Sequence, residues 1–145
     1  MMSGKIVRLS RQKEVRGALE CMSEMVFLEN LGIEGNAFQG GNRQVCLFSS
    51  EARDWVNEQQ IPGLCFKNFT ENVLIGKLPM DTLQSGDRLS IGDVLLQITE
   101  KKPCFDDCEL RSRNISCKLS ANAFFAIVIK GGVVKLEDEV FTVSM

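Results

Sequence analysis

Closely spaced strand patterns constrain the fold of this chain more than any other feature. Residues 87–91 and 94–99 both alternate apolar and polar side chains, and only Gly92 and Asp93 separate them. A two-residue connection that contains glycine is typical of a β-hairpin. Parallel strands need crossovers of about a dozen residues or more, and most gaps between the strand patterns are shorter than that. The sequence therefore predicts a mainly antiparallel β fold.

Strand patterns recur along the whole chain. In order, they cover residues 5–10, 22–29, 44–48, 71–75, 87–91, 94–99, 124–129, 133–136 and 140–143. Gly131 and Gly132 separate two of them and predict a second hairpin. We expect eight or nine short strands in one domain over residues 1–145. Closure into a β-barrel is the expected architecture, because it removes exposed strand edges.

One helix, or at most two short ones, is expected beside these strands. Ser49 or Ser50 can cap a helix, and the apolar residues Ala52 and Val56 follow at helical spacing. The sequence Ile61-Pro62-Gly63 ends this pattern.

Composition limits the kinds of partner. The net charge of −2 gives no electrostatic footprint for nucleic acid, and no apolar run is long enough for a membrane helix. Residues 1–8 lack the apolar stretch of a signal peptide, so we expect a cytoplasmic protein with reduced cysteines. The chain contains no histidine, which removes the commonest general base and zinc ligand.

Three of the six cysteines lie in one segment between two predicted strands. They are Cys104, Cys108 and Cys117, and Pro103 precedes the first of them. If Pro103 begins a short helix, Cys104 lies in its first turn, where free backbone N–H groups favour a thiolate. A Cys104 that carries sulfur or ligates a soft metal is therefore one hypothesis.

Other interpretations of the three thiols stay open. They could hold a metal together, or Cys104 and Cys108 could form a redox disulfide. All three could also be small buried hydrophobic residues, as free cysteines often are. The remaining cysteines have apolar neighbours in the sequence, and we expect them to be core residues. They are Cys21, Cys46 and Cys65.

A glycine-rich segment, residues 35–43, has the composition of an anion site. Gly35, Gly40 and Gly41 allow backbone N–H groups to be presented, and Arg43 can grip a phosphate or carboxylate. The alternative is a wide loop whose arginine pairs with a nearby acid. Polar groups at other strand ends, taken singly, are expected to be solvated. They are Glu71, Asn72 and Lys130.

Taken in order, these motifs resemble the MOSC domain. The glycine segment with Arg43, then Glu71-Asn72-Val73, the hairpin at Gly92-Asp93, the three cysteines and Lys130-Gly131-Gly132 follow the family pattern. MOSC is the C-terminal domain of molybdenum cofactor sulfurases and also occurs as small stand-alone prokaryotic proteins. The cysteine spacing resembles that stand-alone group.

The resemblance implies a β-barrel that handles molybdenum cofactor, or sulfur destined for a metal–sulfur site. It implies that Cys104 is a persulfide carrier or molybdenum ligand, with Cys108 and Cys117 as assisting thiols. It further implies a cofactor-binding cleft framed by Gly35, Asn36, Gly40, Gly41, Arg43, Asn72 and Lys130. The implied partners are the cofactor or its precursor and proteins of cofactor biosynthesis or molybdoenzymes.

The chain also departs from the family pattern. Asn36 and Phe38 replace the usual Asp and His, Phe105 replaces a frequent His, and Ile127 replaces a common Arg. A non-catalytic binding module with a degenerate site is therefore an alternative, as is a structural three-cysteine metal site. A pyridoxal-phosphate desulfurase domain does not fit in 145 residues, so that cofactor is not expected. The sequence leaves open whether the chain turns over a substrate.

Overall fold

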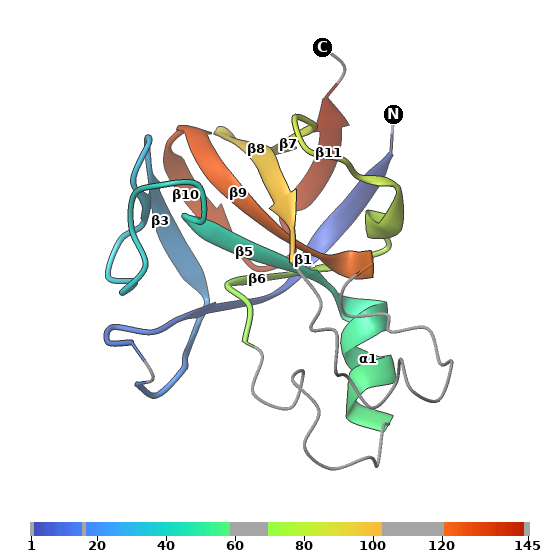
Figure 1. The fold of residues 1–145 in the computed structure, drawn as a ribbon, viewed down its shortest axis with the longest axis horizontal. Coiled ribbons are helices and arrows are strands. Elements are labelled where there is room, and N and C mark those ends of the chain that lie inside the picture. The colour runs from blue at the N-terminus through green and yellow to red at the C-terminus, as the bar shows by residue number, and fades with distance from the viewer. Residues whose placement is uncertain (1, 16, 59–69, 103–120, 144–145) are drawn as a thin grey trace.

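The computed structural model describes residues 2–15, 17–58, 70–102 and 121–143. Within these residues, seven strands close into a barrel (Figure 1), because β11, at one end of an eight-stranded sheet, also pairs with β1, the last strand but one at the other end. Around the barrel the order is β1 (Ser3–Arg11), β6 (Val73–Gly76), β5 (Val45–Ser49), β9 (Ala123–Lys130), β8 (Val94–Lys101), β7 (Arg88–Ile91) and β11 (Glu139–Val143). The predicted β-barrel of short strands is confirmed.

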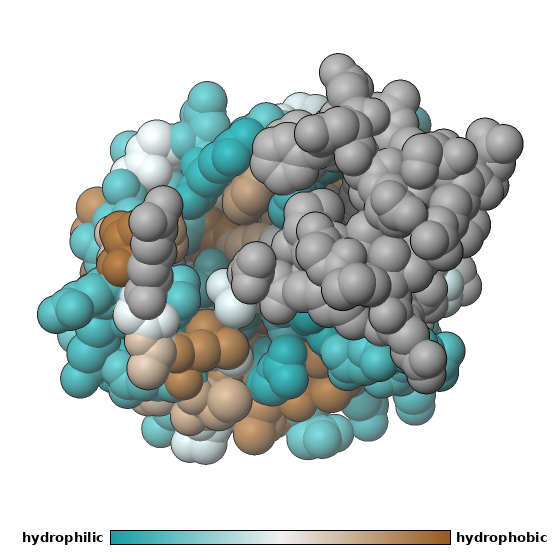
Figure 2. All heavy atoms as spheres, turned by 60° about the horizontal axis from the view of Figure 1, so that its bottom comes forward, coloured by the Kyte–Doolittle hydropathy of each residue, from teal (hydrophilic) through white to brown (hydrophobic). Residues whose placement is uncertain are grey.

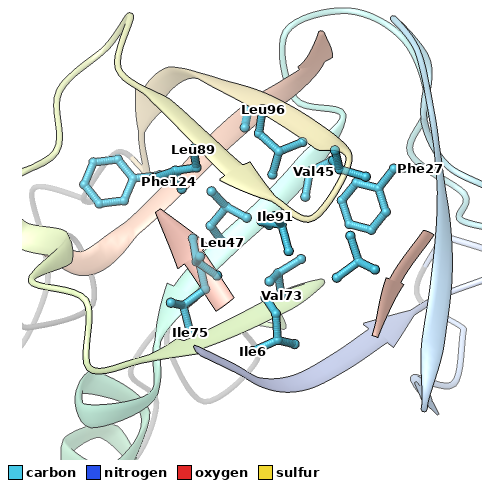
Figure 3. Close-up of a cluster of buried hydrophobic side chains, with 14 of the residues drawn as sticks. Ile6, Phe27, Val45, Leu47, Val73, Ile75, Leu89, Ile91, Leu96 and Phe124 are labelled. Atoms are coloured by element: carbon cyan, nitrogen blue, oxygen red, sulfur yellow. The ribbon is translucent and has the colours of Figure 1, made fainter. Parts of the chain in front are cut away.

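The core fills the inside of the barrel (Figure 3). Val94, Leu96 and Ile98 on β8 are each at most 1% exposed, while the residues between them are half-buried. This is the alternation that the sequence predicted. Side chains from six of the other strands and from the small sheet described below meet them in the interior. They include Ile6, Phe27, Val45, Leu47, Val73, Ile75, Leu89, Val128 and Val140.

The hairpin predicted at Gly92-Asp93 is confirmed, because Ile91 pairs with Val94 across it. The second predicted hairpin is wrong. After β9 the chain passes to β10 (Gly132–Lys135), which pairs with β3 (Glu24–Leu28) and not with β9. A Cβ on Gly131 would lie 2.5 Å from the carbonyl oxygen of Phe27, so a glycine is needed where the chain changes sheets.

The strand predicted over residues 22–29 divides into two. β2 (Glu20–Met22) pairs with β1 of the barrel, while β3 joins a small sheet with β10 and β4 (Gly32–Ile33). Among the described strands, the mainly antiparallel prediction holds with one exception, since β5 and β6 are parallel. The segment between these two strands contains the helix and gives the chain room for that single crossover.

The helix α1 (Ser50–Glu58) follows β5 directly. The Ser49 hydroxyl accepts a hydrogen bond from the Ala52 N–H at 3.2 Å, as expected for an N-cap, and Ala52 and Val56 are buried. A one-turn 3-10 helix, Met80–Thr82, lies between β6 and β7. None of the helices in the described residues is long and apolar enough to span a membrane.

Candidate functional site

Arg43, just before β5, lies over the outer surface of the barrel. Residues paired directly across strands share a face of a sheet, and Cys46, Phe125 and Glu100 are paired in this way on β5, β9 and β8. Because their neighbours Leu47, Phe124 and Ala126 point into the core, these three side chains point outward. The candidate site therefore lies on the outer surface of the barrel, around the paired residues Cys46 and Phe125.

The Arg43 guanidinium is held from two sides. Its Nε donates to a Glu100 carboxylate oxygen at 2.6 Å, and its Cζ lies 4.5 Å from the centre of the Phe125 ring. The hydrogen bond to Glu100 raises the pKa of Arg43 above its ordinary value. The Arg43 side chain is still 52% exposed. Pairing with a nearby acid, the alternative considered above, is what the structure has, and the exposed edge of the guanidinium can still meet an anion.

Cys46 is buried beneath this surface. Burial raises the pKa of its thiol to about 12; Glu71 raises it further, and Lys102, Arg53 and Arg43 lower it. The thiol is therefore protonated at neutral pH and is not a nucleophile. Its prediction as a core residue is confirmed, but the same prediction for Cys21 is wrong, because Cys21 is exposed on the short strand β2. Cys65 lies outside the described residues.

Glu71 is not a solvated residue, contrary to the sequence prediction. Its side chain is only 2% exposed, and its two carboxylate oxygens accept from Arg8 of β1 and from Arg53 of α1. Arg53 also lies over the Phe48 ring, with its Cζ 4.8 Å from the ring centre. One buried carboxylate thus joins a barrel strand to the helix.

Asn72 connects three strands of the barrel. Its side-chain oxygen accepts from the Cys46 N–H at 2.9 Å, and its side-chain nitrogen donates to the Ser10 carbonyl at 3.1 Å. Its backbone N–H and C=O bond the same two residues. The side-chain amide of Asn72 is therefore hydrogen-bonded to the backbones of β5 and β1. These bonds also hold the backbone next to Glu71 in place.

The glycine-rich segment packs against both β sheets. Gly40 and Gly41 have φ values of 77° and 69°, where side chains are disfavoured, and a Cβ on either would meet no atom within 4 Å. Gly35 lies against the Arg11 side chain. Asn36 is 6% exposed, and its side-chain oxygen accepts from the Gln12 N–H at 3.0 Å. Gly40 and Gly41 are thus the open part of the segment.

The predicted site residues are not all gathered at one place. Lys130 is exposed and pairs with Leu95, five residues along β9 from Phe125, which is about 17 Å at the usual rise of a strand. Lys102 lies at the opposite end, where its N–H donates to Ala123 at 2.9 Å. Cys104, Cys108 and Cys117 follow Lys102 in the sequence and lie outside the described residues. Among the residues that are described, no group of three metal-ligating side chains occurs.

A separate cleft of about 500 Å³ lies beside the N-terminus of α1 and the turn at residues 77–81. Burial would raise the pKa of Glu51 there, but hydrogen bonds from the Lys77 N–H, its own N–H and Ser49 lower it overall. The Glu51 carboxylate therefore supplies the negative charge that this helix end favours, and the cleft shows no surplus of donors for an anion. Outside the residues drawn in grey, the face of the molecule in Figure 2 mixes hydrophilic and hydrophobic residues.

Arg8 and Arg53 also belong to the site, although the sequence did not point to either. Each is one arginine in an otherwise ordinary strand or helix pattern, so neither gives a local signal. The buried Glu71 that joins them lies 63 residues from Arg8 and 18 from Arg53. Only the closed barrel brings the three together.

The fold and the site define a small β-barrel protein that carries arginine side chains on its outer face. The family model for the MOSC domain matches residues 34–141. The chain belongs to the MOSC domain family, as its motifs suggested. This family is associated with sulfur handling related to the molybdenum cofactor.

Solved structures show the same fold at low sequence identity. The YuaD protein from Bacillus subtilis is 18% identical, with a TM-score of 0.68 over 96% of this chain and 94% of that one. YiiM from Escherichia coli is 18% identical, with a TM-score of 0.62 over 97% of this chain and 70% of that one. YiiM from Geobacillus stearothermophilus is also 18% identical, with a TM-score of 0.63 over 97% and 75%. A search of curated proteins gave no match.

Proposed function

We propose that this protein binds molybdenum cofactor, or its precursor, on the outer face of β5 and β9 and handles sulfur for it. The observation that carries the proposal is the placement of Arg43. Its guanidinium is half exposed, lies over the Phe125 ring and is oriented by Glu100. An oriented arginine edge beside an aromatic ring suits a ligand that carries both a phosphate and a flat ring system.

The donor set fits an anionic group. Four cations lie around Cys46 or bind its neighbour Glu71: Arg8, Arg43, Arg53 and Lys102. The described acids that pair with them are Glu71 and Glu100. Gly40 and Gly41 shortly precede Arg43 in the sequence, and a Cβ on either would meet no atom within 4 Å. A ligand could therefore approach their backbone closely. Gly35, Asn36 and Asn72 would shape the cleft through the backbone that they hold, and Lys130 would extend it toward the far end of β9.

Cys104 is the proposed carrier of sulfur. Its thiolate would attack the outer sulfur of a persulfide on a donor protein. That sulfur would become a persulfide on Cys104, and the donor cysteine would leave as a thiolate. Cys108 and Cys117 would resolve or protect this persulfide. Alternatively, Cys104 would ligate molybdenum when the cofactor, which supplies the metal centre, is bound. The proposed setting is the cytoplasm, and the proposed partners are cofactor-biosynthesis proteins or molybdoenzymes.

The role of Arg43 is tested by cofactor binding. Arg43→Gln should weaken binding of molybdopterin about 10- to 100-fold, the expected loss for a charged hydrogen bond. Lys135→Gln, which removes one positive charge from the small sheet, should change it less than about twofold. Equal affinities of both variants and the wild-type protein, measured by fluorescence quenching under anaerobic conditions, would refute a cofactor site at Arg43.

The Arg43–Glu100 ion pair favours one alternative, a binding module that performs no chemistry. An arginine already neutralised by Glu100 suits weak or regulated anion binding. This alternative predicts that the cofactor binds without turnover and that Cys104→Ser leaves both binding and sulfur content unchanged.

A further inference from the structure

We propose that Arg8 and Arg53, held in place by Glu71, form a second subsite for a tetrahedral oxyanion, separate from Arg43. The site takes a phosphate group, carried either by a larger ligand or by free inorganic phosphate. The inference rests on the proposed function only for its suggestion that the larger ligand is the cofactor.

The geometry of the three side chains supports this assignment. Each oxygen of the Glu71 carboxylate accepts from a different guanidinium, so Glu71 fixes two arginines at once. Glu71 is 2% exposed and Asn72 anchors the adjacent backbone, so the carboxylate cannot turn away. Two arginines fixed by one buried acid form a preorganised pair, which loses less entropy when it binds an anion than two free side chains would.

Arg8 keeps unused donor capacity. Arg8 remains 40% exposed, and none of the described residues accepts from its buried Nε–H. A guanidinium has five N–H donors, and Glu71 uses one from Arg8 in the described contacts. The exposed part of the Arg8 side chain therefore leaves further N–H donors for an anion.

The surrounding charge points the same way. The triad of Arg8, Arg53 and Glu71 has a net charge of +1, and Lys102 lies close enough to lower the pKa of the nearby Cys46 thiol. The chain as a whole carries −2, so this positive excess is local.

Inorganic phosphate binding at constant ionic strength, measured by calorimetry, is the first arm of the test. Arg8→Gln should weaken phosphate binding at least about 10-fold. Arg8→Lys keeps the charge but loses the planar fork, and it should weaken binding about 3-fold or more. The matched control is Lys5→Gln, an exposed cation on the same strand, which should stay within about twofold of the wild-type protein. Arg8→Lys keeps the test valid if Arg8→Gln fails to fold.

Molybdopterin binding by the same variants is the second arm. Parallel losses for phosphate and molybdopterin would assign the subsite to the phosphate of the cofactor, and a loss for phosphate alone would assign it to a free oxyanion. Phosphate binding that is absent in the wild-type protein, or equally strong in Arg8→Lys and Lys5→Gln, would overturn the inference. Loss of molybdopterin binding in Arg43→Gln, with both phosphate and molybdopterin binding unchanged in the Arg8 variants, would overturn it while leaving the proposed function intact. Arg8-dependent phosphate binding without any molybdopterin binding would support the subsite and refute the proposed function.

Discussion

Replacing Asn72 with alanine tests whether this side chain holds three strands of the barrel together. The change removes the acceptor of the Cys46 N–H and one donor to the Ser10 carbonyl. Both residues are buried, with exposed fractions of 9% and 1%, so water does not readily replace the lost partner. The variant therefore leaves buried polar groups unpaired.

The expected cost follows from these two bonds. A buried N–H without an acceptor costs about 1–3 kcal/mol, and losing the bond to the carbonyl costs about 1 kcal/mol more. Together they lower the free energy of unfolding by about 2–4 kcal/mol, which is a large part of the stability of a domain. The melting temperature should fall by about 5–15 °C for a chain of this length.

Urea unfolding followed by circular dichroism measures this difference. Asn57→Ala is the matched control, since Asn57 lies on the exposed side of α1 and should change stability by no more than about 0.5 kcal/mol. A loss below about 0.5 kcal/mol in Asn72→Ala would refute the argument that its carboxamide serves the backbone. The side chain would then be available for a ligand.

Three more predictions concern the core of the site and the passage between sheets. Glu71→Gln leaves two arginines without their shared carboxylate and should destabilise the protein by about 3 kcal/mol, while the exposed Glu58→Gln should have almost no effect in the same urea titration. Burial raises the pKa of Cys46 to about 12 from 9.0. The unfolded chain therefore loses this proton first, and the free energy of unfolding should fall by roughly 1 kcal/mol per pH unit between these values. Cys46→Ala should remove this slope and Cys21→Ala should keep it; an unchanged slope in Cys46→Ala would contradict the assignment. Gly131→Ala places a Cβ against the backbone of β3 and should cost about 1–3 kcal/mol in thermal unfolding, whereas an unaltered melting temperature would mean that the close approach is relaxed easily.

Local patterns predicted the local parts of the fold. The hairpin at Gly92-Asp93 and the capped helix after Ser49 depend on residues that are neighbours in the sequence, and both are confirmed. The pairing of β10 with β3 joins segments about a hundred residues apart in the printed sequence and depends on how the two sheets pack. A pair of glycines between two strands occurs in hairpins and also where the chain passes from one sheet to another. The sequence around Gly131 could not distinguish these two cases, which is why the hairpin prediction was wrong.

The same limit applies to the candidate site. The sequence indicated that Arg43 was a binding candidate or the partner of an acid, but it could not identify Glu100 as that acid, 57 residues away. The sequence also predicted that Glu71 would be exposed to solvent, because a charged residue just before a strand usually is. The two arginines that bury it come from β1 and α1, and no local pattern connects them.

The measurement that tests the central claim most directly is the sulfur and molybdenum content of protein purified anaerobically. Intact mass and elemental analysis should compare the wild-type protein with Cys104→Ser, and with Cys21→Ser as a control at the exposed cysteine. If Cys104 carries the sulfur or ligates molybdenum, we expect one added sulfur atom or bound molybdenum in the wild-type protein and in Cys21→Ser, and neither in Cys104→Ser. Unchanged loading of Cys104→Ser, or a wild-type mass without added sulfur or metal, would contradict this role of Cys104.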